Sequence, residues 1–236
     1  MDQPQQFSAK VSEHEELNKK FHLVRLELVK PAVINFQAGQ YLSLDIGGGE
    51  RRAYSICSKP SENNRVELCV DLTPGGKGII YLKNLQPGAE VKFLGPLGRF
   101  TVAPPAGGEK KLLFMATGCG IAPIKSMIYD LLEDKKDRRE MWLLWGLRFV
   151  EDMFWVEEFR EMDEFYKNLH YRLLLSKPPE KWPVEAGHVT DVLEDIKLDK
   201  DWGAYLCGNP AMLEEAKVLV KKKGVPETQV HFEKFI

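Results

Sequence analysis

A change of sequence pattern at residues 103–109 divides the chain into two dissimilar parts. This stretch is rich in proline, glycine and alanine, which is typical of a linker. Before it, short apolar runs alternate with turn residues, and after it strand patterns alternate with helical ones. The sequence therefore predicts two domains, over residues 1–104 and 109–236.

The first part consists of short strand patterns separated by turns that contain glycine, proline or asparagine. Strands are expected at residues 21–29, 41–46, 52–58, 66–72, 91–94 and 99–102. A short helix is expected directly after the glycine-rich turn at residues 75–78. Short strands at such regular spacing predict a small antiparallel β-barrel.

The second part alternates strands with helices. Continuous apolar runs at residues 112–116 and 141–147 predict strands that are buried on both faces, and further strands are expected at 171–176, 204–207 and 229–235. Helical spacing of apolar residues is found at 121–132, 151–162 and 211–223, and residues 189–196 continue the alternation. This order predicts a doubly wound parallel sheet with helices on both faces, which binds ligands beyond the carboxyl ends of its strands.

Residues 51–58 carry a cation, an aromatic ring and a hydroxyl within one predicted strand. Arg52 and Tyr54 should point to one side of the strand and Ser55 to the other. Arg52 can pair with a phosphate, Tyr54 can stack on a planar ring, and Ser55 can hydrogen-bond its edge. The glycine-rich turn at 75–78 adds backbone N–H groups for an anion, so a pyrophosphate ligand is plausible. The alternative is an ordinary barrel strand with a surface arginine and a half-buried tyrosine.

Two motifs lie at carboxyl ends of strands in the second part: Thr117, Gly118, Cys119 and Gly120 form the first, and Cys207, Gly208, Asn209 and Pro210 form the second. The glycines of the first allow the backbone to approach a ligand, and the helix that follows can accept a pyrophosphate at its N-terminus. It is not the full G-x-G-x-x-G fingerprint. The second lies between a strand and a helix, and its cysteine could equally be a small buried apolar side chain.

Charge and cysteine spacing exclude several classes of protein. A net charge of −2, from 33 basic and 35 acidic residues, argues against nucleic-acid binding. The basic clusters at 135–139 and 221–223 are typical of solvated helix ends, and docking of an acidic protein partner stays open. The polar N-terminus and the absence of an apolar run of about 18 residues predict a cytoplasmic protein without a membrane span. Four widely spaced cysteines without a C-x-x-C pair predict no metal site and no disulfide, so redox chemistry would need an organic cofactor.

These motifs, in this order, resemble the ferredoxin–NADP reductase superfamily over nearly the whole chain. Residues 52–55 look like its flavin-binding R-x-Y-S/T motif, and residues 95–100 like the segment that closes its barrel beside the flavin. Residues 117–123 are similar to its G-x-G-x-A-P loop, residues 207–210 to its C-G-x-P motif, and residues 232–235 to its closing E-x-F. No iron–sulfur domain is expected in the chain.

The resemblance implies a bound FAD in the first domain, with FMN left open. Arg52 would hold the flavin phosphates, Tyr54 would pack on the isoalloxazine, and Ser55 would hydrogen-bond near the reactive N5. Ile79 stands where many relatives have serine or threonine, which removes one hydroxyl contact and predicts weaker retention of the flavin. The full set of implied flavin contacts is Arg52, Ala53, Tyr54, Ser55, Val70, Lys77, Gly78 and Ile79.

The resemblance also implies that NAD(P)H binds the second domain, with the nicotinamide near Cys207, Ser55 and Glu233 and with Phe235 close by. These four residues, Ser55, Cys207, Glu233 and Phe235, are the implied catalytic residues. Cys207 would orient the ring, and Glu233 would stabilise the transfer geometry or relay a proton. Without the resemblance, Glu233 would be interpreted as a solvated charge and Phe235 as a core anchor. Candidates for a 2′-phosphate are Arg148, Ser176 and Lys177, which favour NADPH and leave NADH open.

The implied activity is that of an NAD(P)H-dependent flavoprotein reductase. Hydride would pass from NAD(P)H to FAD, and single electrons from there to an external carrier such as ferredoxin or flavodoxin. Three alternatives stay open: an NAD(P)H:flavin reductase that holds flavin loosely as a substrate, the reductase component of an oxygenase or another redox complex, and a non-catalytic flavin-binding subunit. The last is disfavoured because such a subunit has no chemical need for Gly118, Gly120, Cys207 and Glu233. The acceptor, the direction of electron flow and the oligomeric state are not encoded in any motif.

Overall fold

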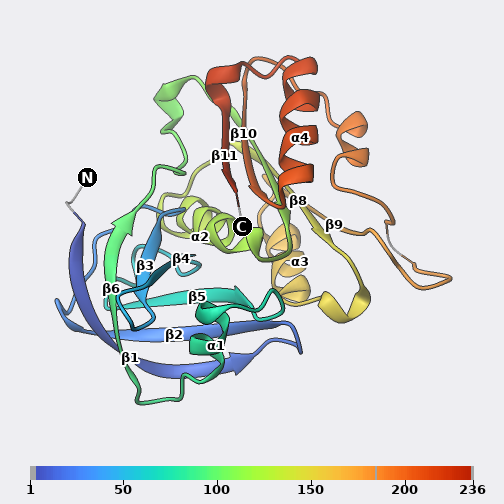
Figure 1. Ribbon diagram of the computed structural model, residues 1–236. Helices are drawn as coiled ribbons and strands as arrows, with labels where there is room; N and C mark the ends of the chain where they lie inside the picture. Colours follow the sequence, from blue (N-terminus) through green and yellow to red (C-terminus); the bar gives the residue numbers. More distant parts are fainter. Residues whose placement is uncertain (1–3, 184, 235–236) are drawn as a thin grey trace. The chain divides into compact units, whose positions relative to one another are not determined.

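The computed structural model describes residues 4–183 and 185–234 (Figure 1). The described residues form two compact units. The first contains the chain up to Thr101 together with Lys125–Lys135, and the second contains Val102–Ile124 and the chain from Lys136 onward. The change from one unit to the other at Thr101 falls beside the predicted linker at residues 103–109.

The first unit is a six-stranded antiparallel sheet with the strand order β4-β3-β6-β1-β2-β5. Beyond the end of β4, Ile56 forms an isolated bridge to Leu68 of β5, and the Cys57 N–H donates to the Glu67 carbonyl oxygen at 2.9 Å. These contacts bring the two edge strands together, so the sheet is nearly closed and the prediction of an antiparallel barrel is confirmed. Its elements are β1 (Gln5–Glu16), β2 (Phe21–Lys30), β3 (Tyr41–Asp45), β4 (Arg51–Ser55), β5 (Arg65–Asp71), α1 (Lys77–Lys83) and β6 (Glu90–Leu97).

The barrel core is built from alternate residues of its strands. In β1, Phe7, Ala9 and Val11 are buried, and the Phe7 ring stacks on Phe93 with centroids 5.0 Å apart. Strand β1 is not among the strands predicted from the sequence, although this alternation is the signal of a half-buried strand. The strand expected at residues 99–102 is wrong. There the chain turns on itself, with the Thr101 N–H donating to the Arg99 carbonyl, instead of pairing with a neighbouring strand.

The second unit contains a five-stranded parallel sheet with the strand order β11-β10-β7-β8-β9, as the alternating pattern predicts. None of the described helices is long and apolar enough to cross a membrane. The strands are β7 (Lys111–Thr117), β8 (Glu140–Leu147), β9 (Leu169–Leu175), β10 (Trp202–Gly208) and β11 (Val230–Lys234). The α-helices that follow the linker are α2 (Ile121–Tyr129), α3 (Val156–Phe165) and α4 (Pro210–Lys222), and the part of α2 from Lys125 onward belongs to the first unit. The short helical turns are η1 (Pro105–Gly107), η2 (Gly118–Gly120), η3 (Asp130–Asp134, in the first unit), η4 (Val150–Asp152), η5 (Asp191–Asp195) and η6 (Glu227–Gln229).

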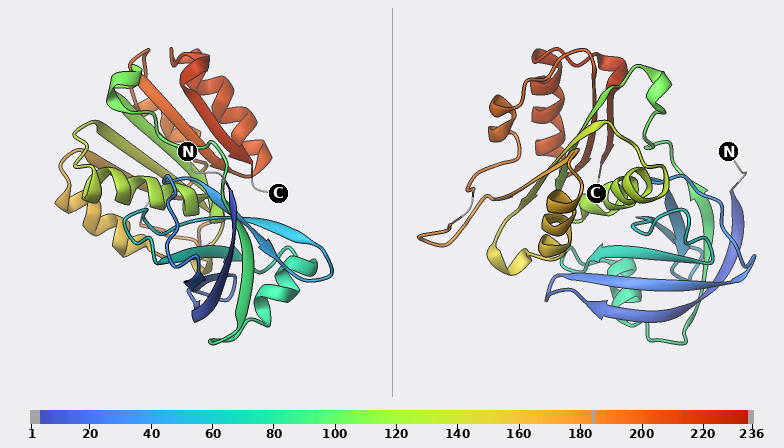
Figure 2. Two further views of the ribbon diagram at one scale, coloured as in Figure 1. Left: turned by 90° about the vertical axis from the view of Figure 1, so that its left-hand side faces the viewer. Right: turned by 180° about the vertical axis from the view of Figure 1, so that it is seen from behind.

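Helices α3 and α4 cover opposite faces of this sheet (Figure 2). Leu213 of α4 belongs to the same buried cluster as Leu144 of β8. The ring of Phe159 on α3 instead contacts Trp145, the next residue of β8, at a centroid distance of 5.9 Å. Since successive strand residues point to opposite faces, the prediction of helices on both sides is confirmed.

Two predicted elements differ from the structure. The helix expected at 151–162 begins only at Val156, because Trp155 before it has a left-handed backbone with φ +52° and residues 150–152 form a separate turn. Residues 191–195 are a short helical turn, so the segment 189–196 contributes no strand or α-helix to the alternation.

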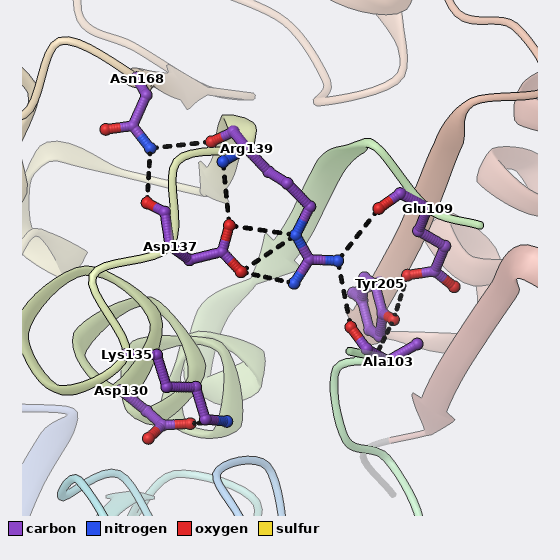
Figure 3. A network of polar contacts seen from close by, with 8 residues as sticks. All are labelled: Ala103, Glu109, Asp130, Lys135, Asp137, Arg139, Asn168 and Tyr205. Atoms are coloured by element: carbon purple, nitrogen blue, oxygen red, sulfur yellow. Dashed lines mark hydrogen bonds and ion pairs between the residues drawn. The ribbon is translucent and has the colours of Figure 1, made fainter. Parts of the chain in front are cut away.

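A buried network around Arg139 fixes the start of the second unit (Figure 3). The Arg139 guanidinium forms a salt bridge with Asp137 at 2.7 Å and donates to the carbonyl oxygens of Ala103 and Glu109, both at 3.1 Å. Arg139 is only 8% exposed, so the prediction that the cluster at 135–139 is a solvated helix end is wrong for this residue. A guanidinium can be buried here because backbone oxygens and a carboxylate satisfy its donors.

The Glu109 carboxylate belongs to the same network. It is 2% exposed, accepts from the Tyr205 hydroxyl at 2.6 Å and lies 2.8 Å from His231 Nε2. A Cβ atom at position 203 would lie 2.3 Å from a Glu109 carboxylate oxygen, so Gly203 leaves the room for it. The network therefore ties residues 103–109 to strands β10 and β11 of the second unit.

Candidate functional site

The first candidate site lies where β4 meets the start of α1. A Cβ atom at Gly78 would lie 2.9 Å from both Arg52 Cγ and the Tyr54 hydroxyl, so these two side chains share one side of β4, as predicted. The Tyr54 ring is half-buried against the barrel core. Burial raises the pKa of Tyr54, and the nearby Arg52 cation opposes that shift only in part. Tyr54 is therefore a neutral ring at physiological pH that can stack on a planar ligand.

Two cations of this site converge on one carboxylate. An Arg52 guanidinium nitrogen lies 3.0 Å from Glu50 Oε2, and the Lys77 ammonium binds Glu50 Oε1. The Lys77 and Arg52 bonds lower the pKa of Glu50. Glu50 is not among the residues predicted from the sequence, where its only signal is its place two residues before Arg52. Because Arg52 and Lys77 together hold an anionic oxygen group, this donor set suits a flavin phosphate.

The turn before α1 depends on its glycines. Gly75 and Gly76 have φ +79° and +89°, values at which a side chain would be strained. Gly76 precedes the helix without a side-chain cap on the first N–H groups of α1. Ile79 packs against the barrel core, so this position contributes hydrophobic contact where a serine or threonine would offer a hydroxyl.

The remaining predicted flavin contacts, Ser55, Val70 and Ala53, differ in their exposure. Ser55 is 4% exposed at the end of β4, opposite Tyr41 of β3. Val70 is 2% exposed in the barrel core, so only its main chain could reach a ligand. Ala53 is exposed in the middle of β4. The flavin contacts of these residues stay predictions.

The second candidate site lies at the carboxyl ends of the adjacent strands β7 and β10. A Cβ atom at Gly120 would lie 2.2 Å from the Cys207 carbonyl oxygen. A Cβ atom at Gly208, which has φ +148°, would lie 2.1 Å from Thr117 Oγ1. The structure thus brings both predicted motifs into direct contact, and only glycine allows this approach at either position.

Asn209 links these two motifs by hydrogen bonds. Its backbone N–H and its Nδ2 donate to Thr117 Oγ1 at 3.0 and 3.1 Å. Its Oδ1 accepts the N–H of Met212 at 2.9 Å and so caps the N-terminus of α4, whose first residue is Pro210. On the other side of β7, Trp145 Nε1 donates to the Gly118 carbonyl at 3.1 Å. The backbone of both loops is therefore fixed without any ligand contact.

Cys207 and Glu233 are directly opposite in the pairing of β10 with β11. The Cys207 side chain is fully buried, and burial raises its pKa well above the ordinary thiol value, with smaller contributions from Glu233 and Cys119. A thiol that stays protonated is a poor nucleophile, and the orienting role of Cys207 stays a prediction. Phe235 lies outside the described residues.

Arg148, Ser176 and Lys177 lie together at the ends of β8 and β9. The Ser176 N–H donates to the Leu147 carbonyl at 3.0 Å, and the Lys177 N–H donates to the Arg148 carbonyl at 2.9 Å. Arg148 and Lys177 are exposed, and the Arg148 guanidinium lies 5.2 Å from the centre of the Phe149 ring. A group of this composition suits an anionic substituent, and its contact with a 2′-phosphate stays a prediction.

Comparison with known families matches both parts of the chain. Residues 8–102 match the model of an oxidoreductase FAD-binding domain, and residues 114–217 match that of an oxidoreductase NAD-binding domain. The two matches coincide with the parts of the chain that carry the two candidate sites.

Individual proteins are similar over most of the chain. A ferredoxin–NADP reductase B of Sorangium cellulosum is 33% identical over 211 residues, which are 85% of this chain and 85% of that protein. The phenol hydroxylase P5 protein of Acinetobacter pittii is 33% identical over 98% of this chain, which spans 66% of that protein. The structure of the Amycolatopsis cytochrome P450 reductase GcoB has a TM-score of 0.90 at 29% identity and covers 100% of this chain, which spans 71% of it.

Proposed function

Since the chain belongs to the ferredoxin–NADP reductase superfamily, as an NAD(P)H-dependent flavoprotein oxidoreductase with FAD- and NAD-binding domains, we propose that it passes electrons singly to a separate carrier protein. Hydride would be transferred from NAD(P)H to FAD, and a carrier such as ferredoxin or flavodoxin would accept the electrons from the reduced flavin. The observation that carries the proposal is that each unit holds a coherent site, Arg52, Tyr54 and Lys77 in one and the joined loops at Thr117 and Cys207 in the other.

The residues of the first unit bind and orient the flavin in this proposal. Arg52 and Lys77 exchange Glu50 for the phosphate oxygens, and Tyr54 packs on the ring system. Bound FAD supplies a group that accepts two electrons together and releases them one at a time. The protein contributes binding and orientation, because hydride transfer depends mainly on the distance between donor and acceptor atoms.

The residues of the second unit orient the nicotinamide dinucleotide. Gly118 and Gly120 expose backbone at the end of β7, where a pyrophosphate can approach. Cys207 ends β10 with a neutral, fully buried side chain, which would have to become accessible in order to contact and orient the nicotinamide. Glu233, its neighbour on β11, adds a carboxylate that can accept a hydrogen bond or hold a proton.

The group formed by Arg148, Ser176 and Lys177 supports NADPH as the donor. Two exposed cations and a hydroxyl at adjacent strand ends suit a 2′-phosphate. Replacing both cations, as in Arg148→Ala with Lys177→Ala, should raise KM for NADPH and leave KM for NADH nearly unchanged. An equal rise for both nucleotides would contradict this assignment.

An NAD(P)H:flavin reductase is the second candidate, and two observations favour it. Ile79 faces the barrel core and offers no hydroxyl, and Glu50 competes with a phosphate for Arg52 and Lys77. Both features weaken the hold on a flavin. The names of the relatives also support a role as reductase component of an oxygenase, of which this chain would be the flavoprotein part.

The purified protein distinguishes these functions. Bound flavin is quantified first, and NADPH or NADH oxidation is then followed with ferredoxin, with flavodoxin or with free FMN as the acceptor. The proposal expects about one FAD per chain and a protein carrier that turns over faster than free flavin. Substoichiometric flavin with fastest turnover on added FMN would replace it by the flavin reductase.

A further inference from the structure

The Thr117 hydroxyl oxygen is an acceptor of two hydrogen bonds from one residue. Asn209 reaches it with its backbone N–H at 3.0 Å and with its side-chain Nδ2 at 3.1 Å. Thr117 is the last residue of β7 and stands directly before the loop Gly118–Gly120. The two hydrogen bonds therefore act on the residue that leads into the candidate nucleotide-binding loop.

The orientation of the Asn209 amide is fixed by the helix that follows. Oδ1 accepts the Met212 N–H at 2.9 Å as the cap of α4. Oxygen is the only acceptor of an amide side chain, so Nδ2 has to face Thr117. One side chain thus caps a 13-residue helix and, with its other end, donates to the hydroxyl.

These contacts determine the polarity of the hydroxyl. A threonine hydroxyl has two acceptor lone pairs and one proton, and both lone pairs are used by Asn209. Thr117 can therefore act toward any further group only as a donor. Within residues 4–183 and 185–234, the structure assigns no acceptor to this proton.

We propose that Asn209 is a positioning residue that makes Thr117 an obligate hydrogen-bond donor to an acceptor oxygen of the bound nicotinamide dinucleotide. The proposal rests on the proposed function, since it concerns the nucleotide site of the same enzyme. It also explains the close packing at Gly208, where a Cβ atom would lie 2.1 Å from the Thr117 oxygen and would displace it. Asn209 acts through Thr117, and Thr117 touches the nucleotide.

The test measures binding of NAD⁺ and NADP⁺ to the oxidised, flavin-loaded enzyme by isothermal titration calorimetry, which needs no turnover. Thr117→Val removes the hydroxyl and keeps the shape, and should weaken binding of the preferred nucleotide about tenfold. Asn209→Ser keeps a helix cap, removes the Nδ2 donor, and should weaken binding about threefold. The double variant should bind no more weakly than Thr117→Val alone, because Asn209 acts only through the hydroxyl.

Two controls separate this role from a structural one. Thr117→Ser keeps the hydroxyl and should bind within about twofold of the wild type, at equal flavin content. Thr190→Val removes a buried hydroxyl of the same unit that has no hydrogen-bond partner among the described residues, and should leave binding unchanged. Melting temperature and bound flavin are measured for every variant.

The outcomes distinguish the two levels of the proposal. A wild-type protein that binds neither nucleotide would overturn the proposed function itself. Wild-type binding that Thr117→Val leaves intact would overturn only the donor role of Thr117. Additive losses in the double variant, or a loss in Thr117→Ser as large as in Thr117→Val, would overturn the coupling through the hydroxyl.

Discussion

Replacement of Gly120 by alanine should impair hydride transfer and leave flavin binding intact. In the structure, the new Cβ atom would lie 2.2 Å from the Cys207 carbonyl oxygen, 2.6 Å from its carbon and 2.9 Å from Gly208 Cα. All three are backbone atoms, so no side chain can rotate away. Because Cβ contacts under 3.0 Å essentially do not occur, the two loops have to separate by at least about 0.8 Å.

The magnitude follows from this displacement. Overpacking of a well-packed site costs about 1–3 kcal/mol of folding stability, which a domain of this size can tolerate. A shift of about 1 Å in the groups that position a substrate can slow the chemical step by about 10²-fold. The rate of flavin reduction is measured by anaerobic stopped-flow mixing with NADPH and NADH, and stability by urea denaturation.

Gly107→Ala is the matched control, since a Cβ atom there would meet only Ala103 Cβ, at an ordinary 3.5 Å. It should change neither the rate nor the stability by more than a small amount. Gly120→Ala with a wild-type rate of flavin reduction would refute the conclusion that contact between the loops sets the position of the nucleotide.

Three further predictions concern the flavin site, the Glu109 network and two buried thiols. Glu50→Gln removes the carboxylate charge that competes with a flavin phosphate for Arg52 and Lys77. Flavin affinity in a fluorescence titration should therefore rise about twofold to fivefold. Unchanged or weaker binding would contradict the assigned phosphate site. Tyr205→Phe removes the hydroxyl that donates to the buried Glu109 carboxylate and should lower the free energy of unfolding by about 2–3 kcal/mol. Tyr171→Phe removes a buried hydroxyl that has no hydrogen-bond partner among the described residues, and should leave the free energy of unfolding nearly unchanged. Burial raises the pKa of Cys57 and of Cys207, so above about pH 9 the unfolded chain loses thiol protons that the folded chain keeps. The free energy of unfolding should then fall by up to about 1.4 kcal/mol per pH unit for each thiol, and Cys57→Ala should reduce that slope in urea titrations from about pH 8 to pH 10.

The order of elements was largely predictable, because it depends on hydrophobic periodicity and turn residues that act locally. Continuous apolar runs gave β7 and β8, and the glycines at 75–78 gave the start of α1. The error at residues 99–102 has a non-local cause. Phe100 is buried as a strand residue would be, but residues 98–104 are not in a strand, because strand pairing depends on distant parts of the chain.

The candidate site was predictable in its motifs and not in its contacts. The sequence shows the glycines of both motifs, yet only the three-dimensional structure shows that Gly120 and Gly208 allow one loop to touch the other. The pairing of Arg52 and Lys77 through Glu50 joins residues from two separate elements. Arg139 was misinterpreted as solvated because two of its partners, the backbone oxygens of residues 103 and 109, carry no side-chain signal in the sequence.

The most direct test of the proposed function is an anaerobic visible spectrum of the purified protein, recorded before and after addition of NADH and, separately, NADPH. The purified protein should show the spectrum of bound flavin, which either nucleotide should bleach rapidly, and NADPH should bleach it faster than NADH. A protein whose bound flavin is bleached by neither nucleotide would contradict the hydride-transfer function that both candidate sites support.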